Sequence, residues 1–249
     1  MEEQNKKNNY LFGMHPVFEA INSGKPIEKV FLKKGLEGEQ FRDLLSKMQE
    51  NNIPFQFVPI ERLDKITKGR HQGVVALIPE ITYVPMEEAI ERAIRKSASP
   101  TILMLDGVTD IRNLGAIART AECMGVNCII MPAKGGAAIN AEAIKASAGA
   151  LVRIDVCKVS NLRMAIFYLQ QKNFKIIAAT EKADKSIYNL NLNEPVAIIA
   201  GSEGKGISNS LLALSDERAK IPMAGSIESL NVSASVAIIL YEILRQKRG

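Results

Sequence analysis

The chain has 249 residues, of which 47% are hydrophobic and 24% are charged, as in a soluble globular protein with a substantial core. No apolar run approaches the roughly 18 residues of a membrane-spanning helix, and the first ten residues lack the apolar segment of a secretory signal. We therefore expect a cytoplasmic protein with no membrane partner. The net charge of +5 permits a polyanionic partner but does not require one, because many proteins without a nucleic-acid role are this basic.

Reactive side chains of several common enzyme classes are scarce. Cys123, Cys128 and Cys157 have no metal-type spacing, so we expect buried, reduced thiols. His15 and His71 are the only histidines, and neither has a metal-ligand partner nearby in the sequence. The chain has no G-x-S-x-G motif and no C-x-x-C motif. These observations disfavour metal, covalent serine and thiol chemistry.

The N-terminal third predicts a small α/β unit. Residues 1–9 resemble a disordered lead, and residues 10–81 carry alternating apolar patterns. The expected elements are a helix starting near Pro16, strands at 29–32, 56–59 and 73–78, and an amphipathic helix at 40–51. Residues 82–100 are more polar and predict a linker that contains a charged helix, Met86 to Lys96. A helix docked on one of the domains is the alternative for this segment.

Residues 101–249 alternate apolar strands with helices, which favours a mostly parallel sheet covered on both faces. The strands are expected at 102–105, 128–131, 154–156, 175–179, 196–200 and 220–221. The helices are expected near 113–124, 141–148, 161–172, 208–214 and 231–247. Ligands of such sheets bind beyond the carboxyl ends of the strands. The loops after Leu105, Ala200 and Ile221 are therefore the candidate sites.

The loop after the first of these strands begins with a polar turn. Asn113 is expected to be the N-cap or a first-turn residue of the next helix, and Arg119 follows six residues later. An arginine there can bind a phosphate or hold a carboxylate. A capped helix with one surface salt bridge explains the same residues without any function.

The other two loops are rich in glycine and small polar residues. Gly201 opens a run with three glycines in six residues that surrounds Glu203, and this spacing fits neither a P-loop nor a dinucleotide motif. The carboxylate could accept a hydrogen bond from a ligand, or it could simply be solvated. Ser229 and Asn231 are good caps for the last helix, which begins with small residues that allow a close approach.

These three loops, in this order, resemble the signature motifs of the SpoU (TrmH-type) branch of the SPOUT RNA 2′-O-ribose methyltransferases. The matching segments are 106–119, 199–206 and 221–233, so the resemblance covers the C-terminal domain. Segments 13–20 and 71–76 resemble the small L30e-like substrate-binding domain of the RlmB-like members.

The resemblance implies a fold that general rules exclude, because these rules predict an unknotted sheet. It implies a SPOUT α/β knot, in which the second and third loops form a deep trefoil knot that holds S-adenosylmethionine. The cofactor contacts would come from Gly201, Ile221 and Leu230. The resemblance also implies a homodimer with its active site at the subunit interface, and no metal.

The same resemblance assigns five residues to catalysis: Asn113, Arg119, Glu203, Ser229 and Asn231. Arg119 is sometimes regarded as the base in this family, but a guanidinium keeps its proton, so we favour a phosphate anchor that also stabilises the alkoxide. Glu203 or a phosphate-linked water is then the expected proton acceptor. The implied substrate is a guanosine of large-subunit ribosomal RNA. The alternatives are transfer RNA and a non-catalytic RNA-binding factor on the same fold.

Overall fold

The computed structural model describes residues 10–67, 69–78, 81–226 and 229–249, and the chain forms two compact units, Met1–Thr82 and Tyr83–Gly249. The disordered lead expected at 1–9 lies outside the described residues. Among the residues that are described, no helix is long and apolar enough to cross a membrane.

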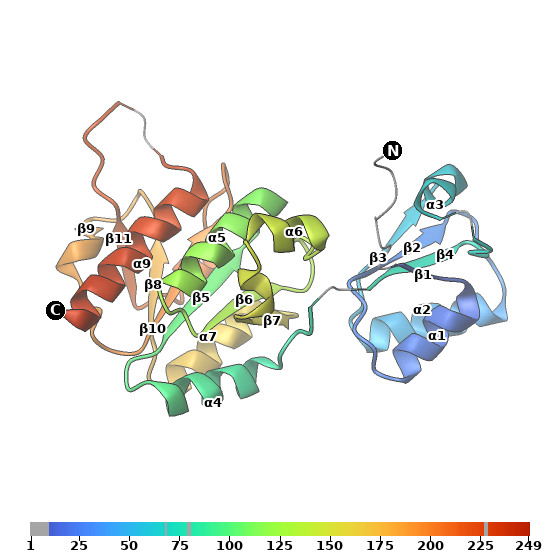
Figure 1. Ribbon diagram of the computed structural model, residues 1–249, viewed down its shortest axis with the longest axis horizontal. Helices are drawn as coiled ribbons and strands as arrows, with labels where there is room; N and C mark the ends of the chain where they lie inside the picture. Colours follow the sequence, from blue (N-terminus) through green and yellow to red (C-terminus); the bar gives the residue numbers. More distant parts are fainter. Residues whose placement is uncertain (1–9, 68, 79–80, 227–228) are drawn as a thin grey trace. The chain divides into compact units, whose positions relative to one another are not determined.

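The first unit is a four-stranded sheet with helices on both faces. Its elements are β1 Tyr10–Phe12, α1 Met14–Asn22, β2 Lys29–Lys33, α2 Glu39–Glu50, β3 Phe55–Val58, α3 Ile60–Ile66 and β4 Val74–Leu77 (Figure 1). The strand order is β1-β4-β2-β3, with β4 antiparallel to β1 and β2, and with β3 parallel to β2.

Alternation along β2 explains the two layers of this unit. Val30 and Leu32 pack with α1 and α2 in one core cluster, whereas Phe31 packs with Leu63 of α3 in another. The expected helices and strands are present, and α1 begins two residues before Pro16. The sequence did not predict β1 or α3, because three-residue and seven-residue elements are too short to establish a period.

The second unit is built on a seven-stranded sheet in the order β7-β6-β5-β10-β8-β11-β9, and every described strand pair in it is parallel. Its helices are α4 Met86–Lys96, α5 Ile111–Cys123, α6 Ala141–Ala146, α7 Leu162–Gln171, α8 Asn209–Leu212 and α9 Val232–Arg248, with short 3-10 turns η1 Ala150–Val152 and η2 Ile187–Asn189. Its strands are β5 Thr101–Asp106, β6 Cys128–Pro132, β7 Asp155–Val159, β8 Lys175–Ala179, β9 Lys185–Ser186, β10 Val196–Gly201 and β11 Glu217–Lys220. The mostly parallel α/β sheet is thus confirmed, and the trefoil knot stays a prediction.

Helices cover both faces of this sheet. Ile102 and Met104 of β5 share one core cluster with α4, α7 and α8. The alternate residues Leu103 and Leu105 are buried on the other face, where α5 packs between α6 and α9 (Figure 1). Ile90 of α4 is fully buried in the first of these layers. The helix expected in segment 82–100 therefore docks on the second unit, so this part of the segment is not a free linker.

Two local expectations are corrected. The strand expected at 220–221 is β11, Glu217–Lys220, which Ile221 follows. Charged residues occupy three of its four positions because it lies near the edge of the sheet, so an apolar pattern could not reveal it. Cys123 is exposed at the end of α5, whereas Cys128 and Cys157 are buried free thiols. A hydrogen bond with Cys157 and burial raise the pKa of Cys128, so this thiol stays protonated.

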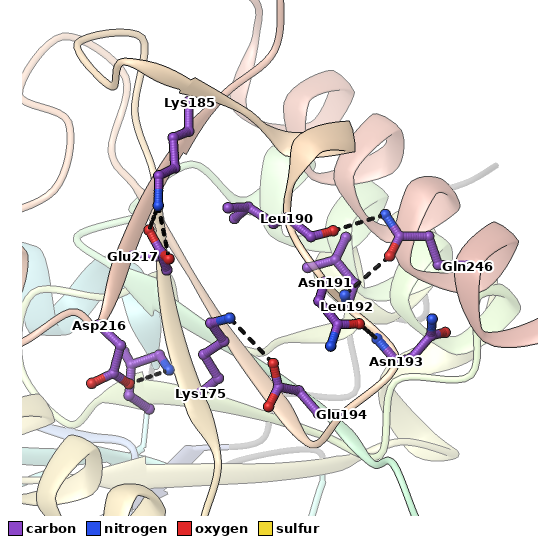
Figure 2. A network of polar contacts seen from close by, with 11 residues as sticks. Lys175, Lys185, Leu190, Asn191, Leu192, Asn193, Glu194, Asp216, Glu217 and Gln246 are labelled. Carbon is purple, nitrogen blue, oxygen red and sulfur yellow. Dashed lines mark hydrogen bonds and ion pairs between the residues drawn. The ribbon is translucent and has the colours of Figure 1, made fainter.

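The C-terminal end of α9 is tied to the segments that lead into the two central strands. Gln246 Oε1 accepts from the backbone N–H of Leu192 (3.0 Å), and its Nε2 donates to the carbonyl oxygen of Leu190 (3.1 Å), as Figure 2 shows. Lys247 Nζ donates to the carbonyl oxygen of Ser99 (2.6 Å) and to Thr101 Oγ1 (2.8 Å). The N-cap of α9 belongs to the site described next, so hydrogen bonds to other segments hold both ends of this helix.

Candidate active site

The predicted loops meet at the carboxyl edge of the parallel sheet. Asp106, the last residue of β5, accepts a hydrogen bond through Oδ2 from the backbone N–H of Ser208 (2.8 Å), which joins the first loop to the segment after β10. Asp110 is the N-cap of α5 and accepts from the backbone N–H of Asn113 (2.8 Å). Asn113 is thus a first-turn residue, which was one of the two expected positions.

Three side chains, one from each loop, form a polar cluster. Asn113 Nδ2 donates to Glu203 Oε1 (3.1 Å), and Asn231 Nδ2 donates to Asn113 Oδ1 (3.0 Å). Asn231 Nδ2 also contacts Glu203 Oε1. Asn231 is the N-cap of α9, and its Oδ1 accepts from the backbone N–H of Ser233 (2.9 Å). Capping fixes this amide, so the two asparagines hold one oxygen of the carboxylate in place.

The glycine-rich loop places that carboxylate at the tip of a tight turn. Ser202 and Gly206 exchange two backbone hydrogen bonds (3.2 and 2.9 Å) across the turn. Gly204 and Gly206 have φ angles of 85° and 67°, which favour glycine. A Cβ on Gly201 would lie 2.2 Å from the carbonyl carbon of Gly206, so only glycine allows this closure. Glu203 is exposed at the tip.

Two adjoining cavities lie beside this cluster. The larger has a volume of about 470 Å³, within the range of small-molecule sites, and the smaller about 90 Å³. Ser229 and Leu230 line both cavities. The other predicted residues that line a cavity are Gly201, Glu203 and Asn231 in the larger one, and Ile221 in the smaller one. Six of the eight predicted site residues therefore share one depression.

The walls of the larger cavity are of two kinds. Val232, Val236 and Ile239 of α9 give it an apolar side, and Gly201 with its neighbours gives it a side of backbone. Glu181, after β8, lines both cavities, and the sequence analysis did not select its loop. The strand order could have indicated it, because β8 lies between β10 and β11 and its carboxyl end adjoins the same depression.

Arg119 is the predicted residue that lies apart from the cluster. It is exposed on α5, six residues after Asn113, so the two side chains point about 120° apart around the helix. Within the described residues its guanidinium makes no hydrogen bond or ion pair, and it lines neither cavity. Its catalytic role stays a prediction. Within the same described residues, no group of three or more His, Cys, Asp or Glu side chains could hold a metal ion.

Two family models match the chain, and their limits follow the two units. The SpoU rRNA Methylase family matches residues 100–241. The model described as RNA 2′-O ribose methyltransferase substrate binding matches residues 10–84. Together they cover most of the described chain, including all three loops of the site.

Curated relatives and solved structures agree with these matches. A putative TrmH family tRNA/rRNA methyltransferase of Staphylococcus aureus (strain MSSA476) is 35% identical over 238 residues, which are 95% of this chain and 96% of that protein. A crystal structure of an RNA 2′-O ribose methyltransferase covers 100% of this chain and 93% of its own, with 25% identity and a TM-score of 0.58. The SpoU methyltransferase AviRb from Streptomyces viridochromogenes, in complex with AdoMet, has the same fold at 21% identity, with a TM-score of 0.60 over 98% of this chain and 95% of its own.

Proposed function

We propose that this chain, which belongs to the SpoU family of RNA methyltransferases, methylates the ribose 2′-hydroxyl of a guanosine in large-subunit ribosomal RNA. Membership of the family makes it an S-adenosylmethionine-dependent RNA 2′-O-methyltransferase. The observation that carries the proposal is the Asn113–Glu203–Asn231 cluster, of which Glu203 and Asn231 line the larger cavity. A non-catalytic RNA-binding factor would not need such a cluster beside a cofactor-sized cavity.

The residues around the larger cavity fit S-adenosylmethionine. Its volume of about 470 Å³ suits a nucleoside with an amino-acid side chain, and the apolar side from Val232, Val236 and Ile239 suits an adenine ring. Gly201 lines the larger cavity, and the absence of a Cβ there lets the glycine-rich turn close against the backbone of Gly206 beside the ligand space. We assign cofactor contacts to Gly201 and Leu230 here, and to Ile221 in the adjoining cavity. When bound, the cofactor supplies a methyl group on a sulfonium, which is a good leaving group.

Glu203 is positioned to accept the proton of the ribose hydroxyl. Both asparagine amides contact its Oε1, and within the described residues no group donates a hydrogen bond to its Oε2. The free oxygen can therefore accept the 2′-hydroxyl proton while the 2′-oxygen bonds to the methyl carbon and the carbon–sulfur bond breaks. Asn113 and Asn231 hold the carboxylate in one orientation, and Ser229, on both cavities, can hydrogen-bond to either reactant.

Arg119 supplies the cation that the reaction needs beside an RNA phosphate. Because its exposed guanidinium has no partner within the described residues, it is free to bind a phosphate in a bidentate manner and to stabilise the alkoxide. Arg119 points away from the cluster on α5, and this separation supports a homodimer in which Arg119 of one subunit completes the site of the other. Exposed Ile238 (42%) and Tyr241 (59%) on α9 offer apolar area for such an interface.

The substrate assignment rests on the first unit, because a catalytic domain joined to this substrate-binding module is the arrangement of the ribosomal enzymes that the sequence resembles. The curated relatives are named for both tRNA and rRNA, which keeps transfer RNA as the second candidate. The protonated thiol of Cys128 and the free thiol of Cys157 fit a reducing cytoplasm.

The test is transfer of labelled methyl from S-adenosylmethionine to total RNA from a strain that lacks the endogenous enzyme, followed by digestion and mass spectrometry. A 2′-O-methylguanosine gained in large-subunit rRNA would support the whole proposal. The same product in tRNA alone would keep the chemistry and overturn the substrate. Transfer to neither RNA, with no cofactor binding, would leave a non-catalytic factor as the better explanation.

A further inference from the structure

The first unit has one edge where loops from every strand of its sheet converge. The backbone N–H of Lys33, at the end of β2, donates to the carbonyl oxygen of Gly73 (2.8 Å), and that of Gly13, after β1, donates to the carbonyl oxygen of Val74 (2.9 Å). The next residue after β2, Lys34, donates its backbone N–H to the carbonyl oxygen of Val58 in β3 (3.0 Å). The turn at 69–73 is therefore packed against the ends of β1 and β2.

A buried histidine holds this turn in a strained shape. His71 is 8% exposed, and its Nδ1 accepts from the backbone N–H of Gly73 (3.0 Å) while Nε2 bonds with Asp64 Oδ1 (2.9 Å). Nδ1 is thus the acceptor and Nε2 carries the proton. Gln72 has a positive φ of 49°, a strained conformation for a residue with a side chain that clusters at functional segments, and Gly73 follows it with a φ of 81° that glycine adopts freely. Asp64, whose carboxylate bonds to the turn, is thereby engaged by His71.

Two cations and an aromatic ring are exposed on this turn and on the neighbouring ends of β2 and β1. Lys34 and Arg70 are exposed, and within the described residues neither makes an ion pair. Phe12, at the end of β1, is 39% exposed and packs beside Gly69, where a Cβ would come within 2.4 Å of the ring. Unpaired cations close to an exposed ring suit an unpaired RNA strand, because its phosphates bind positive charge and its bases bind a stacking surface.

We propose that Lys34, Arg70 and Phe12 form the RNA-contacting edge of the first unit, which binds the phosphates and one unstacked base of the substrate. This inference rests on the proposed function, because it gives that reaction's RNA a specific second contact surface. His71 is a positioning residue that fixes the turn carrying Arg70. The surface lies within the first unit, so its role is to bind RNA and not to take part in methyl transfer.

The test uses the full chain and a large-subunit rRNA fragment that the wild type methylates. The variant K34Q/R70Q removes these two exposed cations. K25Q/K47Q is the control that removes the same charge at the opposite end of the sheet, because Lys25 precedes β2 and Lys47, which pairs with Glu50 (3.3 Å), lies in the last turn of α2. We expect K34Q/R70Q to raise the Kd for RNA about tenfold or more and to reduce the salt dependence of log Kd by about two, one for each phosphate contact. The control should bind RNA as the wild type does.

Measurements of methyl transfer distinguish a failure of this inference from a failure of the proposed function. We expect K34Q/R70Q to raise KM for RNA while kcat at saturating RNA and the Kd for S-adenosylmethionine stay unchanged. F12L, which keeps an apolar side chain beside Gly69, should weaken RNA binding without changing its salt dependence. If K34Q/R70Q bound and methylated RNA as well as K25Q/K47Q does, the proposed edge would be wrong although the enzyme works. If the wild type itself neither bound nor methylated RNA, the proposed function would fail instead.

Discussion

Asn113 Nδ2 donates a hydrogen bond of 3.1 Å to Glu203 Oε1, although 90 residues separate the two side chains along the chain. The contact joins the first turn of α5 to the loop after β10, and β5 and β10 are neighbouring parallel strands. Because their carboxyl ends meet at one edge, two segments that are distant in sequence supply one site. Replacing either residue should therefore disturb a shared unit.

Glu203→Gln should lower kcat by about 10²-fold or more, because a neutral amide cannot accept the ribose proton as a carboxylate does. Affinity for S-adenosylmethionine, measured by calorimetry, should stay near that of the wild type. Glu181→Gln is the matched control, since it removes the other carboxylate of the cavity without touching either asparagine, and its loss of kcat should be much smaller. Full turnover by Glu203→Gln, together with loss of turnover by Arg119→Lys, would reverse our division of roles.

Arg119→Gln should leave the free energy of unfolding within about 0.5 kcal/mol of the wild type, because the side chain is exposed and has no partner within the described residues. Its kcat/KM for RNA should fall, and the salt dependence of log kcat/KM should fall by about one. Arg119→Lys keeps the charge but loses the planar guanidinium that binds a phosphate through two hydrogen bonds, so it should retain only part of the wild-type activity. Arg163 is exposed on α7 at the other face of the sheet, so Arg163→Gln is the control and should leave kcat/KM for RNA and its salt dependence unchanged.

Gly201→Ala should abolish cofactor binding and destabilise the second unit by about 1–3 kcal/mol, because the added methyl meets the backbone of Gly206 and Ile207 within 2.4 Å. Gly225→Ala provides the comparison in the third loop. A Cβ there has no described atom within 4 Å and its φ is not positive, so that variant should cost less than about 0.5 kcal/mol. Thermal unfolding with and without S-adenosylmethionine measures both effects. An equal response of the two variants would show that the closure at Gly201 is not required.

The sequence predicted the strands that are buried on both faces, such as β8 at Lys175–Ala179, because continuous apolar runs leave little alternative. It failed for β11, whose charged residues carry no such signal, and for the loop of Glu181, which depends on strand order. The resemblance to the SpoU motifs assigned Glu203 and Asn231 to the site, yet the hydrogen bond between them depends on a sheet order that sequence alone does not specify. Arg119 was selected by resemblance, and a single chain gives it no partner within the described residues.

Lys247 lies at the end of α9, and its burial lowers its pKa from the ordinary value of 10.5 to about 8. Between these values the unfolded chain binds more protons at this residue than the folded chain, so the free energy of unfolding should rise with pH through that window. Two oxygens, the carbonyl of Ser99 and Thr101 Oγ1, accept from the ammonium group and offset part of its desolvation cost below pH 8.

Lys247→Met removes the titrating group while keeping most of the side-chain volume. The free energy of unfolding of the wild type, relative to this variant, should therefore increase from pH 8 to 10.5, the window set by the two pKa values. Urea denaturation of both proteins across that window measures the difference. A difference that stayed constant would mean that Lys247 has its ordinary pKa, and one that fell with pH would mean that the ammonium form is the better bound in the folded chain.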